Sequence, residues 1–471
     1  MKVDKADIFW SYTAQFFSIG TNILILPILL RYLSADEMGF YYILLAISSF
    51  VILFDFGFAP QFGRNITYVF AGAQKLSKEG IDTEENTSTI NYNLLFSLIN
   101  ACKYLYVRLS IVILILMGSL GTVYIYNITN GFSSINNALL IWVIYSISVF
   151  FNMYYAYYSS LMNGRGMIAE HRKSIVYSKL AYTIIILLLI TFNFGLLSVA
   201  IANLVAPFIA RYVLYHYFFD KDIKSRWKKF KQTGESDSIE TIKIIWYNAK
   251  KLGLVYIGTF ALGQLGIIIA GWFLSFSEIA SFGLMTQIVA LLTVVASTVN
   301  TSYQARITFL KTKGEKSLMI REFAYTLAVF IMLFTSGAVI FVIIEQDILS
   351  MIGSKTMLPN RLLIIVYCIA VFLEKHYNIF TSYILLGNTV PFTKSVLISG
   401  VAVAVLIVSA FVYTEMRLWV LVLVPLIVQS IFNNWYWPSI VCNEFKLKYP
   451  ELLRIGAHAL INRLRKIDGN G

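Results

Sequence analysis

Charged side chains inside long apolar stretches are the feature of this sequence that most needs a chemical explanation. Glu374 and Lys375 lie in the run VYCIAVFLEKHYNIFTSYILLG, more than a dozen residues after Arg361. In a bilayer, an ionised side chain costs about 2.5–3.5 kcal/mol or more and is tolerated mainly in a bundle interior or a wet cavity. These two charges therefore either line a transport pathway or neutralise partners on neighbouring helices.

Further polar groups share this environment, and most of them are cationic. Cations inside or at the ends of the apolar stretches outnumber the acids Asp55 and Glu374, so a pathway built from them favours an anionic passenger. The candidate substrate-binding residues are Arg64, Lys179, Asn248, Lys250, Lys251, Arg306, Lys375 and Asn378.

Several of these residues have a simpler interpretation. The side chains of Lys250 and Lys251 are long enough to reach a membrane surface from within a helix. Arg64 and Arg306 are placed where ordinary cytoplasmic anchors occur, although their matched positions in the two halves of the chain also favour an inner vestibule. Both interpretations stay open for each of these four residues.

Motifs for chemistry in water are missing from the sequence. The four histidines are scattered without an HExxH motif, and the chain has no Walker-type Gly-Lys-Ser/Thr loop. The three cysteines are far apart in the sequence and form no CxxC motif, so they imply neither a zinc site nor a disulfide framework; they are Cys102, Cys368 and Cys442. We therefore expect no catalytic residues, no metal and no cofactor.

The elements that position these side chains must be membrane helices. The chain is 58% hydrophobic and 13% charged, more apolar than a soluble domain of 471 residues. Because the apolar runs are continuous and about 20 residues long, they predict an all-α polytopic fold. The twelve predicted spans are 9–32, 38–60, 98–126, 137–161, 172–193, 196–219, 244–272, 277–302, 319–344, 361–386, 391–413 and 417–442.

The hairpin LPILLRYLSADEMGFYYILLAISSFVILFDFGFAPQFGRNIT has a weaker copy about 240 residues later. Leu33, Ser34 and Glu37 match Leu274, Ser275 and Glu278, while Gly63-Arg64 matches Ala305-Arg306. Such self-similarity indicates two similar halves. We expect a six-helix lobe over 1–220, a basic cytoplasmic linker over 221–243, a second six-helix lobe over 244–442 and a basic cytoplasmic tail over 443–471.

Charge distribution sets the orientation. With the N-terminus in the cytoplasm, all but four of the 38 lysines and arginines fall on the inner side or in the inner parts of helices; the exceptions are Arg31, Lys355, Arg361 and Arg417. Both termini are thus predicted to be cytoplasmic. The net charge of +13 follows this bias, so we expect contact with anionic membrane lipids, especially at the linker, and none with nucleic acid.

The opening hairpin and this topology resemble the polysaccharide flippases of the MOP superfamily, the Wzx-type O-antigen and capsule transporters. Pro27, Leu33, Gly39, the turn Asp55-Phe56-Gly57 and Arg64 stand where that family has them. The resemblance implies a protein of the bacterial cytoplasmic membrane that flips undecaprenyl-diphosphate-linked oligosaccharide to the outer leaflet by alternating access. It also implies H⁺ or Na⁺ coupling through Asp55 and Glu374, and contact with polysaccharide assembly proteins.

Two other functions remain open from the sequence. A multidrug exporter of the same superfamily would need carboxylates in the N-terminal cavity, and the span 9–32 has none. A polysaccharide polymerase or ligase would be an enzyme with a sizeable outer loop bearing arginines and a histidine. The longest outer loop, 345–360, has no histidine.

Overall fold

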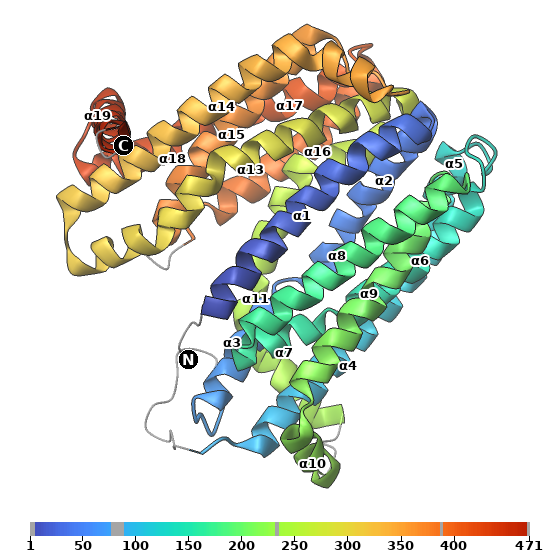
Figure 1. Ribbon diagram of the computed structural model, residues 1–471, viewed down its shortest axis with the longest axis vertical. Helices are drawn as coiled ribbons and strands as arrows, with labels where there is room; N and C mark the ends of the chain where they lie inside the picture. Colours follow the sequence, from blue (N-terminus) through green and yellow to red (C-terminus); the bar gives the residue numbers. More distant parts are fainter. Residues whose placement is uncertain (1–4, 77–88, 231–234, 387–389, 469–471) are drawn as a thin grey trace. The chain divides into compact units, whose positions relative to one another are not determined.

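The computed structural model describes residues 5–76, 89–230, 235–386 and 390–468, and within them the chain is helical without a strand (Figure 1). It divides into two compact units, Met1–Phe260 and Ala261–Gly471. The polar run between the second and third predicted spans, KLSKEGIDTEENTST at 75–89, falls almost entirely outside the described residues. The all-α polytopic fold expected from the sequence is confirmed.

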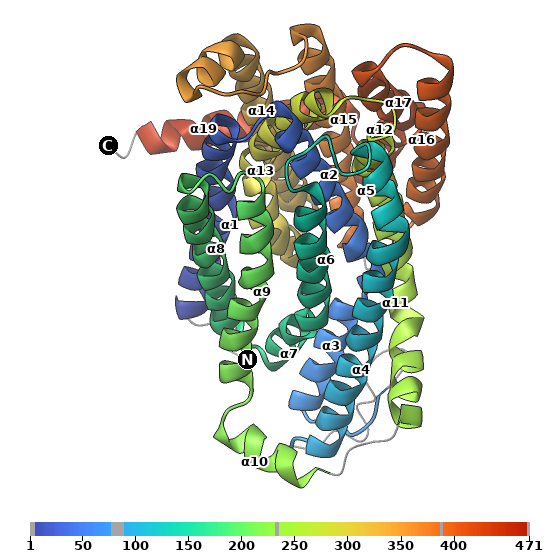
Figure 2. The ribbon, with the colours of Figure 1, turned by 90° about the vertical axis from the view of Figure 1, so that its right-hand side faces the viewer.

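The first unit contains the long helices of the N-terminal half and three shorter pieces. In Figure 2, α6, α8 and α9 run as neighbours, with α10 beyond one end of α9. The helices are α1 (Lys5–Tyr32), α2 (Ala35–Ile52), α3 (Phe58–Phe70), α4 (Tyr92–Leu116), α5 (Thr122–Ile128), α6 (Ala138–Tyr155), α7 (Tyr157–Arg165), α8 (Ile168–Thr191), α9 (Leu197–Phe218), α10 (Lys221–Lys229) and most of α11 (Glu235–Gly263).

The second unit is built from fewer and longer helices. Its core helices α13 and α14 pack along each other, and α14 also carries the C-terminal helix α19. The helices are α12 (Leu265–Ala270), α13 (Phe276–Lys313), α14 (Lys316–Ile352), α15 (Arg361–Leu385), α16 (Thr393–Tyr413), α17 (Leu418–Ile431), α18 (Asn433–Phe445) and α19 (Tyr449–Asp468).

Within the described residues, 11 helical segments are long and apolar enough to cross a membrane. The predicted span 244–272 is the one that falls short, because the helix is interrupted at Gln264, between α11 and α12. Its continuous apolar part is the shorter segment Leu252–Gly263. Gly263 precedes the interruption, which fits the low helix propensity of glycine.

The sequence repeat corresponds to the same local structure in both units. Ser34 caps α2 and Ser275 caps α13, and each serine forms a capping box with the glutamate three residues later. The backbone N–H of Ser34 donates to Glu37 at 2.9 Å, and that of Ser275 donates to Glu278 at 3.0 Å. A capping box satisfies backbone donors that a helix start would otherwise leave unpaired.

Each of these glutamates also holds the residues that precede the last membrane helix of its own unit. Glu37 accepts from the backbone N–H of Leu196, just before α9, at 3.3 Å. Glu278 forms an ion pair with Arg417, just before α17. In each unit a carboxylate in the first turn of a capped helix, α2 or α13, therefore contacts the residues before the last membrane helix, although the donors differ.

The second predicted span, 38–60, bends after α2. After α2, a short 3₁₀ segment, Leu53–Asp55, leads to Phe56 (φ 47°) and Gly57 (φ 79°), and α3 then starts at Phe58. Pro60 lies in the first turn of α3, where a missing N–H costs nothing. The Asp55 carboxylate accepts from the backbone N–H of Ala59 at 3.3 Å and so serves the start of α3.

Gly57 is the residue of this bend that tolerates least change. A Cβ atom at Gly57 would lie 2.8 Å from Leu252 Cβ and 3.0 Å from the Ala249 carbonyl oxygen, in addition to the positive φ. We expect Gly57→Ala to lower the free energy of unfolding by about 2 kcal/mol or more, measured by thermal unfolding in detergent. Gly118→Ala is the control, because a Cβ there meets nothing within 4 Å. Equal stability of the two variants would contradict the prediction.

The predicted basic linker contains a short capped helix. Asp220 accepts from the backbone N–H of Ile223 at 2.9 Å and from Arg165 at 2.6 Å, so it fixes the start of α10 against the end of α7. Although burial raises the pKa of Asp220, these hydrogen bonds outweigh it and hold the pKa below its ordinary value. The contact stabilises the fold above the ordinary aspartate pKa and is lost as the pH falls through the lowered one.

Candidate functional site

Lys179 occupies the middle of a membrane-spanning helix. It lies eleven residues after the start of α8, which corresponds to about 17 Å along the axis. Its side chain is half-buried, and its Nζ lies 5.6 Å from the centre of the Tyr182 ring. No carboxylate of the described chain forms an ion pair with it. A lysine at this depth is therefore an ammonium group without a charged partner.

Two further tyrosines lie close to Tyr182. Tyr41 and Tyr145 lie within electrostatic range of Tyr182, so that α2, α6 and α8 each contribute a phenol. Both are buried, and the Tyr145 hydroxyl is hydrogen-bonded to Ser48 and to the carbonyl of Leu44 on α2. We call Lys179 and Tyr182 the Lys179 site. The sequence identified Lys179. It did not identify the tyrosines, because the chain contains 30 of them and the spacing of these three shows no pattern.

Asp55 lies at the bend after α2 and is held by a tyrosine from α4. The hydroxyl of Tyr106, a fully buried residue, donates to the Asp55 carboxylate. Asp55 itself is half-buried. A carboxylate that is fixed by hydrogen-bond donors and accessible on one side can exchange a proton or a small cation.

The other sequence-predicted residues of the first unit are spread over α3 and α11. Arg64 is exposed and donates to Gln61 Oε1 at 2.6 Å. Lys250 is exposed, with Nζ 5.5 Å from the Tyr247 ring centre. Asn248 and Lys251 belong to α11, but their side chains lie outside the described residues. Within the described residues, no hydrogen bond or ion pair joins Arg64, Lys250, Lys179 and Asp55 to one another.

In the second unit, Glu374 and Lys375 are brought together. Lys375 Nζ lies 2.7 Å from Glu374 Oε1, and both side chains are partly exposed. Neither forms an ion pair with another helix of the described chain, so the two charges neutralise each other and leave no net cation. Asn378 accepts hydroxyl donors from Thr381 and Ser382 at its backbone carbonyl. The polar face predicted for this helix thus contains a neutral pair.

Arg306 has a carboxylate partner that the sequence analysis missed. Glu322 of α14, whose side chain is 1% exposed, lies 3.3 Å from Arg306 and also pairs with Arg463 of α19. Arg463 donates to the Tyr303 hydroxyl at 2.7 Å and lies 3.8 Å over the Tyr325 ring. Because Glu322 lies within the predicted apolar span 319–344, the sequence already indicated that it needs a cationic partner. Arg306 is therefore part of the attachment of α19.

A second group of cations, also missed, lies toward the α10 end of α9. Arg211 lies 5.3 Å from the Tyr155 ring centre and 5.7 Å from that of Tyr215, and Lys224 of α10 lies 5.3 Å from Tyr215. The Nε atoms of Arg211 and Arg172 are buried without a hydrogen-bond partner in the described chain. The position of Arg211 inside the predicted span 196–219 could have indicated this group from the sequence.

These contacts redistribute the charge expected from the sequence. Lys375 is paired with Glu374, and Arg306 shares Glu322 with Arg463, whereas Lys179, Arg64 and Lys250 have no carboxylate partner in the described part of the chain. Among the described cations that the sequence predicted to bind substrate, those without a carboxylate partner are therefore in the first unit. Among the described residues, no group of three or more His, Cys, Asp or Glu is arranged to hold a metal ion. What the Lys179 site offers is an ammonium group and a phenol hydroxyl, which suit a phosphate or carboxylate.

Comparison with solved structures shows which fold this is. The lipid II flippase MurJ, in an inward closed conformation, matches 97% of this chain and 90% of its own with a TM-score of 0.64 at 14% identity. An inward-facing multidrug resistance MATE family transporter of the MOP superfamily matches 92% of this chain and 95% of its own, with a TM-score of 0.63 at 12% identity. No family sequence model and no curated protein sequence matches the chain.

A third match is a transporter of the same superfamily whose binding pocket differs in polarity. A MOP superfamily transporter from Pyrococcus furiosus, described as having a binding pocket of reverse polarity that suggests a different function, matches 95% of this chain and all of its own. Its TM-score is 0.54 at 11% identity. At these identities the matches show a shared fold. The chain therefore has the fold of the MOP superfamily transporters.

Proposed function

We propose that this chain, which has the fold of MurJ and of the MATE transporters, flips undecaprenyl-diphosphate-linked oligosaccharide from the inner to the outer leaflet of a bacterial cytoplasmic membrane. The observation that carries the proposal is Lys179, an ammonium group in the middle of α8 that has no carboxylate partner among the described residues. A diphosphate supplies the negative charge that this position lacks. The chain is then a transporter and not an enzyme, serving the assembly of a cell-surface polysaccharide.

The Lys179 site suits both polar parts of such a substrate. The diphosphate binds Lys179, because a charge-assisted contact gains strength where water is scarce. A sugar ring contacts the phenol of Tyr182, which is half-buried beside Lys179 and offers an apolar face and a polar tip. Transport by alternating access requires that the site open to each side of the membrane in turn.

The other residues predicted from the sequence have secondary places in this proposal. Arg64 and Lys250, exposed and without carboxylate partners in the described chain, would attract the diphosphate at the cytoplasmic side. Asn248, Lys251, Arg306, Lys375 and Asn378 stay candidates for substrate contact. The neutral pair of Lys375 with Glu374 makes Lys375 a weaker one.

A cation-coupled multidrug exporter is the second candidate function. MATE structures match the fold as well as MurJ does, with a TM-score of 0.63 against 0.64. A cationic drug needs an acidic site, and the described span Phe9–Tyr32 contains no carboxylate. The unpaired Lys179 would also repel such a drug. The fold disfavours a membrane polymerase or ligase, because this chain shares its fold with transporters.

The location of the substrate tests the proposal. In cells that lack this protein, we expect lipid-linked repeat units to accumulate on the cytoplasmic leaflet and surface polysaccharide to disappear. Wild-type protein should restore export of the repeat units and the surface polysaccharide. Accumulation of flipped but unpolymerised repeat units would instead indicate a polymerase. Normal polysaccharide together with increased drug sensitivity would indicate the multidrug exporter.

Asp55 is the carboxylate we propose for ion coupling, with Glu374 as the alternative. In proteoliposomes, a gradient of one pH unit can drive at most about tenfold accumulation per exchanged proton. We expect Asp55→Asn to abolish the response of transport to an imposed H⁺ or Na⁺ gradient, because the amide cannot carry the charge. Its hydrogen bonds with Tyr106 and Ala59 can still form, so the fold should persist.

Tyr106→Phe is the matched control for this prediction, because it removes the hydroxyl and keeps the carboxylate. We expect Tyr106→Phe to retain gradient dependence. If Asp55→Asn also retains it while Glu374→Gln loses it, the coupling group is Glu374. If neither substitution changes it, ion coupling through these carboxylates is wrong.

A further inference from the structure

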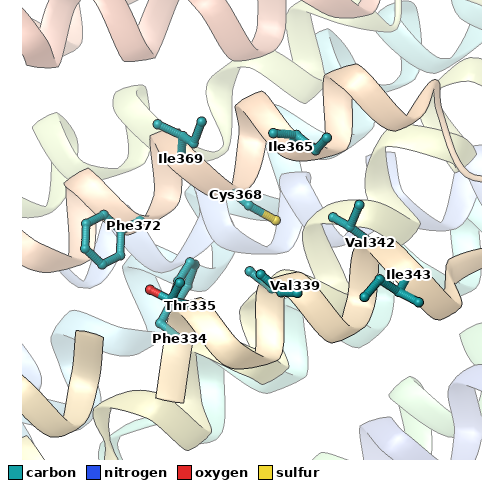
Figure 3. Close-up of a pocket in the computed structure, with 10 residues that line it drawn as sticks. Phe334, Thr335, Val339, Val342, Ile343, Ile365, Cys368, Ile369 and Phe372 are labelled. Atoms are coloured by element: carbon teal, nitrogen blue, oxygen red, sulfur yellow. The ribbon is translucent and has the colours of Figure 1, made fainter. Parts of the chain in front are cut away.

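An apolar groove runs between α14 and α15 in the second unit. It has a volume of about 430 Å³, and Figure 3 shows its lining side chains along the two helices, with Cys368 and Val342 directed into the space between them. Phe334 and Cys368 form its floor, being 1% and 6% exposed. Its rim includes Val339, Ile343 and Ile369, whose exposed fractions are 53%, 66% and 50%. Thr335 is the one hydroxyl in the lining.

The two ends of the groove differ in chemistry. At one end, aromatic rings close it: the Phe372 ring centre lies 5.8 Å from that of Phe334 and 5.9 Å from that of Phe330. At the other end, Glu345 follows Ile343 on α14, and Arg361 precedes Ile365 on α15. Arg361 Nε donates to Glu345 Oε1 at 3.0 Å.

The charged end has unused hydrogen-bonding capacity. The Glu345 side chain is 4% exposed, whereas that of Arg361 is 55% exposed. The Nε atom of Arg361 donates to Glu345, and within the described chain its terminal amino groups form no hydrogen bond or ion pair. A guanidinium presents several donors in a planar fork that matches a phosphate. The mouth of the groove is therefore suited to a phosphodiester.

The length of the groove corresponds to one leaflet. From Phe334 to Ile343 the helix advances by nine residues, which is about 14 Å. Half of a bilayer's hydrocarbon core is about 15 Å. Both helices are apolar enough to span a membrane, so the groove lies among lipid chains. Its closed aromatic end then lies near the bilayer centre.

We propose that this groove binds one acyl chain of a glycerophospholipid whose phosphate contacts Arg361. The apolar lining excludes a polar occupant, the single-leaflet length fits one acyl chain, and the guanidinium at the mouth pairs with the phosphate. An undecaprenyl chain is much longer than one leaflet and does not fit between the ring cluster and the ion pair. The site is separate from the Lys179 site and does not depend on what the protein transports.

The test uses the full chain in nanodiscs with a phospholipid that carries a diazirine near the end of one acyl chain. After photolysis, we expect crosslinks at the peptides of α14 and α15 that contain Phe334 and Phe372. Ile369→Trp fills the groove and should reduce this labelling about tenfold, since an overpacked apolar site rejects its occupant. Ile340→Trp is the control, because Ile340 is 54% exposed on α14 but does not line the groove.

The phosphate contact has its own pair of variants. Arg361→Gln should reduce crosslinking about tenfold, because hydrogen bonds to charged groups contribute about 1.5–3 kcal/mol. Arg417→Gln is the matched control, since Arg417 is also paired with a glutamate but lies away from the groove. Probes with phosphatidylglycerol and phosphatidylethanolamine headgroups distinguish recognition of the phosphate from recognition of net lipid charge.

A second measurement needs no variant. Cys368 lines the groove, so an acyl chain should shield its thiol from an apolar maleimide, and delipidation should raise the labelling rate several-fold relative to Cys102, which is buried elsewhere. Labelling spread evenly over the exposed helix faces, or insensitive to Ile369→Trp, would overturn the proposal. So would displacement of the phospholipid probe by a polyprenyl phosphate probe.

Discussion

Replacement of Lys179 by methionine is expected to abolish export of the lipid-linked substrate while the protein still folds. The methionine keeps the length and apolar stem of the lysine and removes its charge. In the described structure the ammonium group has an aromatic neighbour, Tyr182, but no carboxylate. Removing it leaves no opposite charge unpaired, so stability should be unchanged or higher.

The expected loss of transport follows from the strength of the contact. A hydrogen bond to a charged group contributes about 1.5–3 kcal/mol, which corresponds to a drop of about ten- to hundredfold in the transport rate at low substrate. The measurement is uptake of a fluorescent lipid diphosphate into proteoliposomes. Lys179→Arg should restore part of the rate, because it keeps the charge in a side chain of different shape.

Lys394→Gln is the matched control, because it removes an exposed lysine at the start of α16. Transport at the wild-type rate by Lys179→Met would show that the lysine only packs beside Tyr182, and the proposed anion site would be wrong. Faster export of cationic drugs by the same variant would favour the MATE-like function.

Glu322→Gln is expected to be the most destabilising single change in the second unit. The buried carboxylate joins α13, α14 and α19 through Arg306 and Arg463. Removing one partner of a buried ion pair typically costs about 3–5 kcal/mol, because it leaves the other charges uncompensated. We expect about 3 kcal/mol, since Arg306 is 56% exposed and can be hydrated.

Thermal unfolding in detergent measures this loss, and limited proteolysis should show earlier release of α19. Glu415→Gln is the control, because Glu415 is exposed. Combining Glu322→Gln with Arg463→Met should recover part of the stability, since it removes one unpaired guanidinium. An unchanged melting temperature for Glu322→Gln would show that the three helices are held by apolar packing alone.

Local sequence patterns predicted local structure well. The Asp55-Phe56-Gly57 turn predicted the bend after α2, because few residues other than glycine adopt a positive φ easily. The repeated Ser-x-x-Glu pattern indicated matching halves, and both copies are capping boxes. The long apolar runs predicted the membrane helices, apart from the interruption at Gln264.

Pairing between distant residues could not be predicted in the same way. Lys375 was weighed as a pathway cation or as the partner of a neighbouring helix, and it pairs with the adjacent Glu374. Arg306 was weighed as a mouth residue or an anchor, and its partner is Glu322. Which acid a cation meets depends on how helices pack, and a single sequence does not contain that packing. The proposed lobe boundaries and binding residues remain predictions.

The two capping-box glutamates also bear on how the chain is made. Glu37 can reach Leu196, and Glu278 can reach Arg417, only after the residues that precede the last membrane helix of each unit have been synthesised. The first unit can therefore complete its closing contact while the ribosome is still translating the second, in line with domain-wise folding from the N-terminus. A nascent chain that stops before Arg417 leaves Glu278 without its cation. Truncated products would thus present an uncompensated acid at a helix start, a mark that membrane quality-control proteases could distinguish from the finished protein.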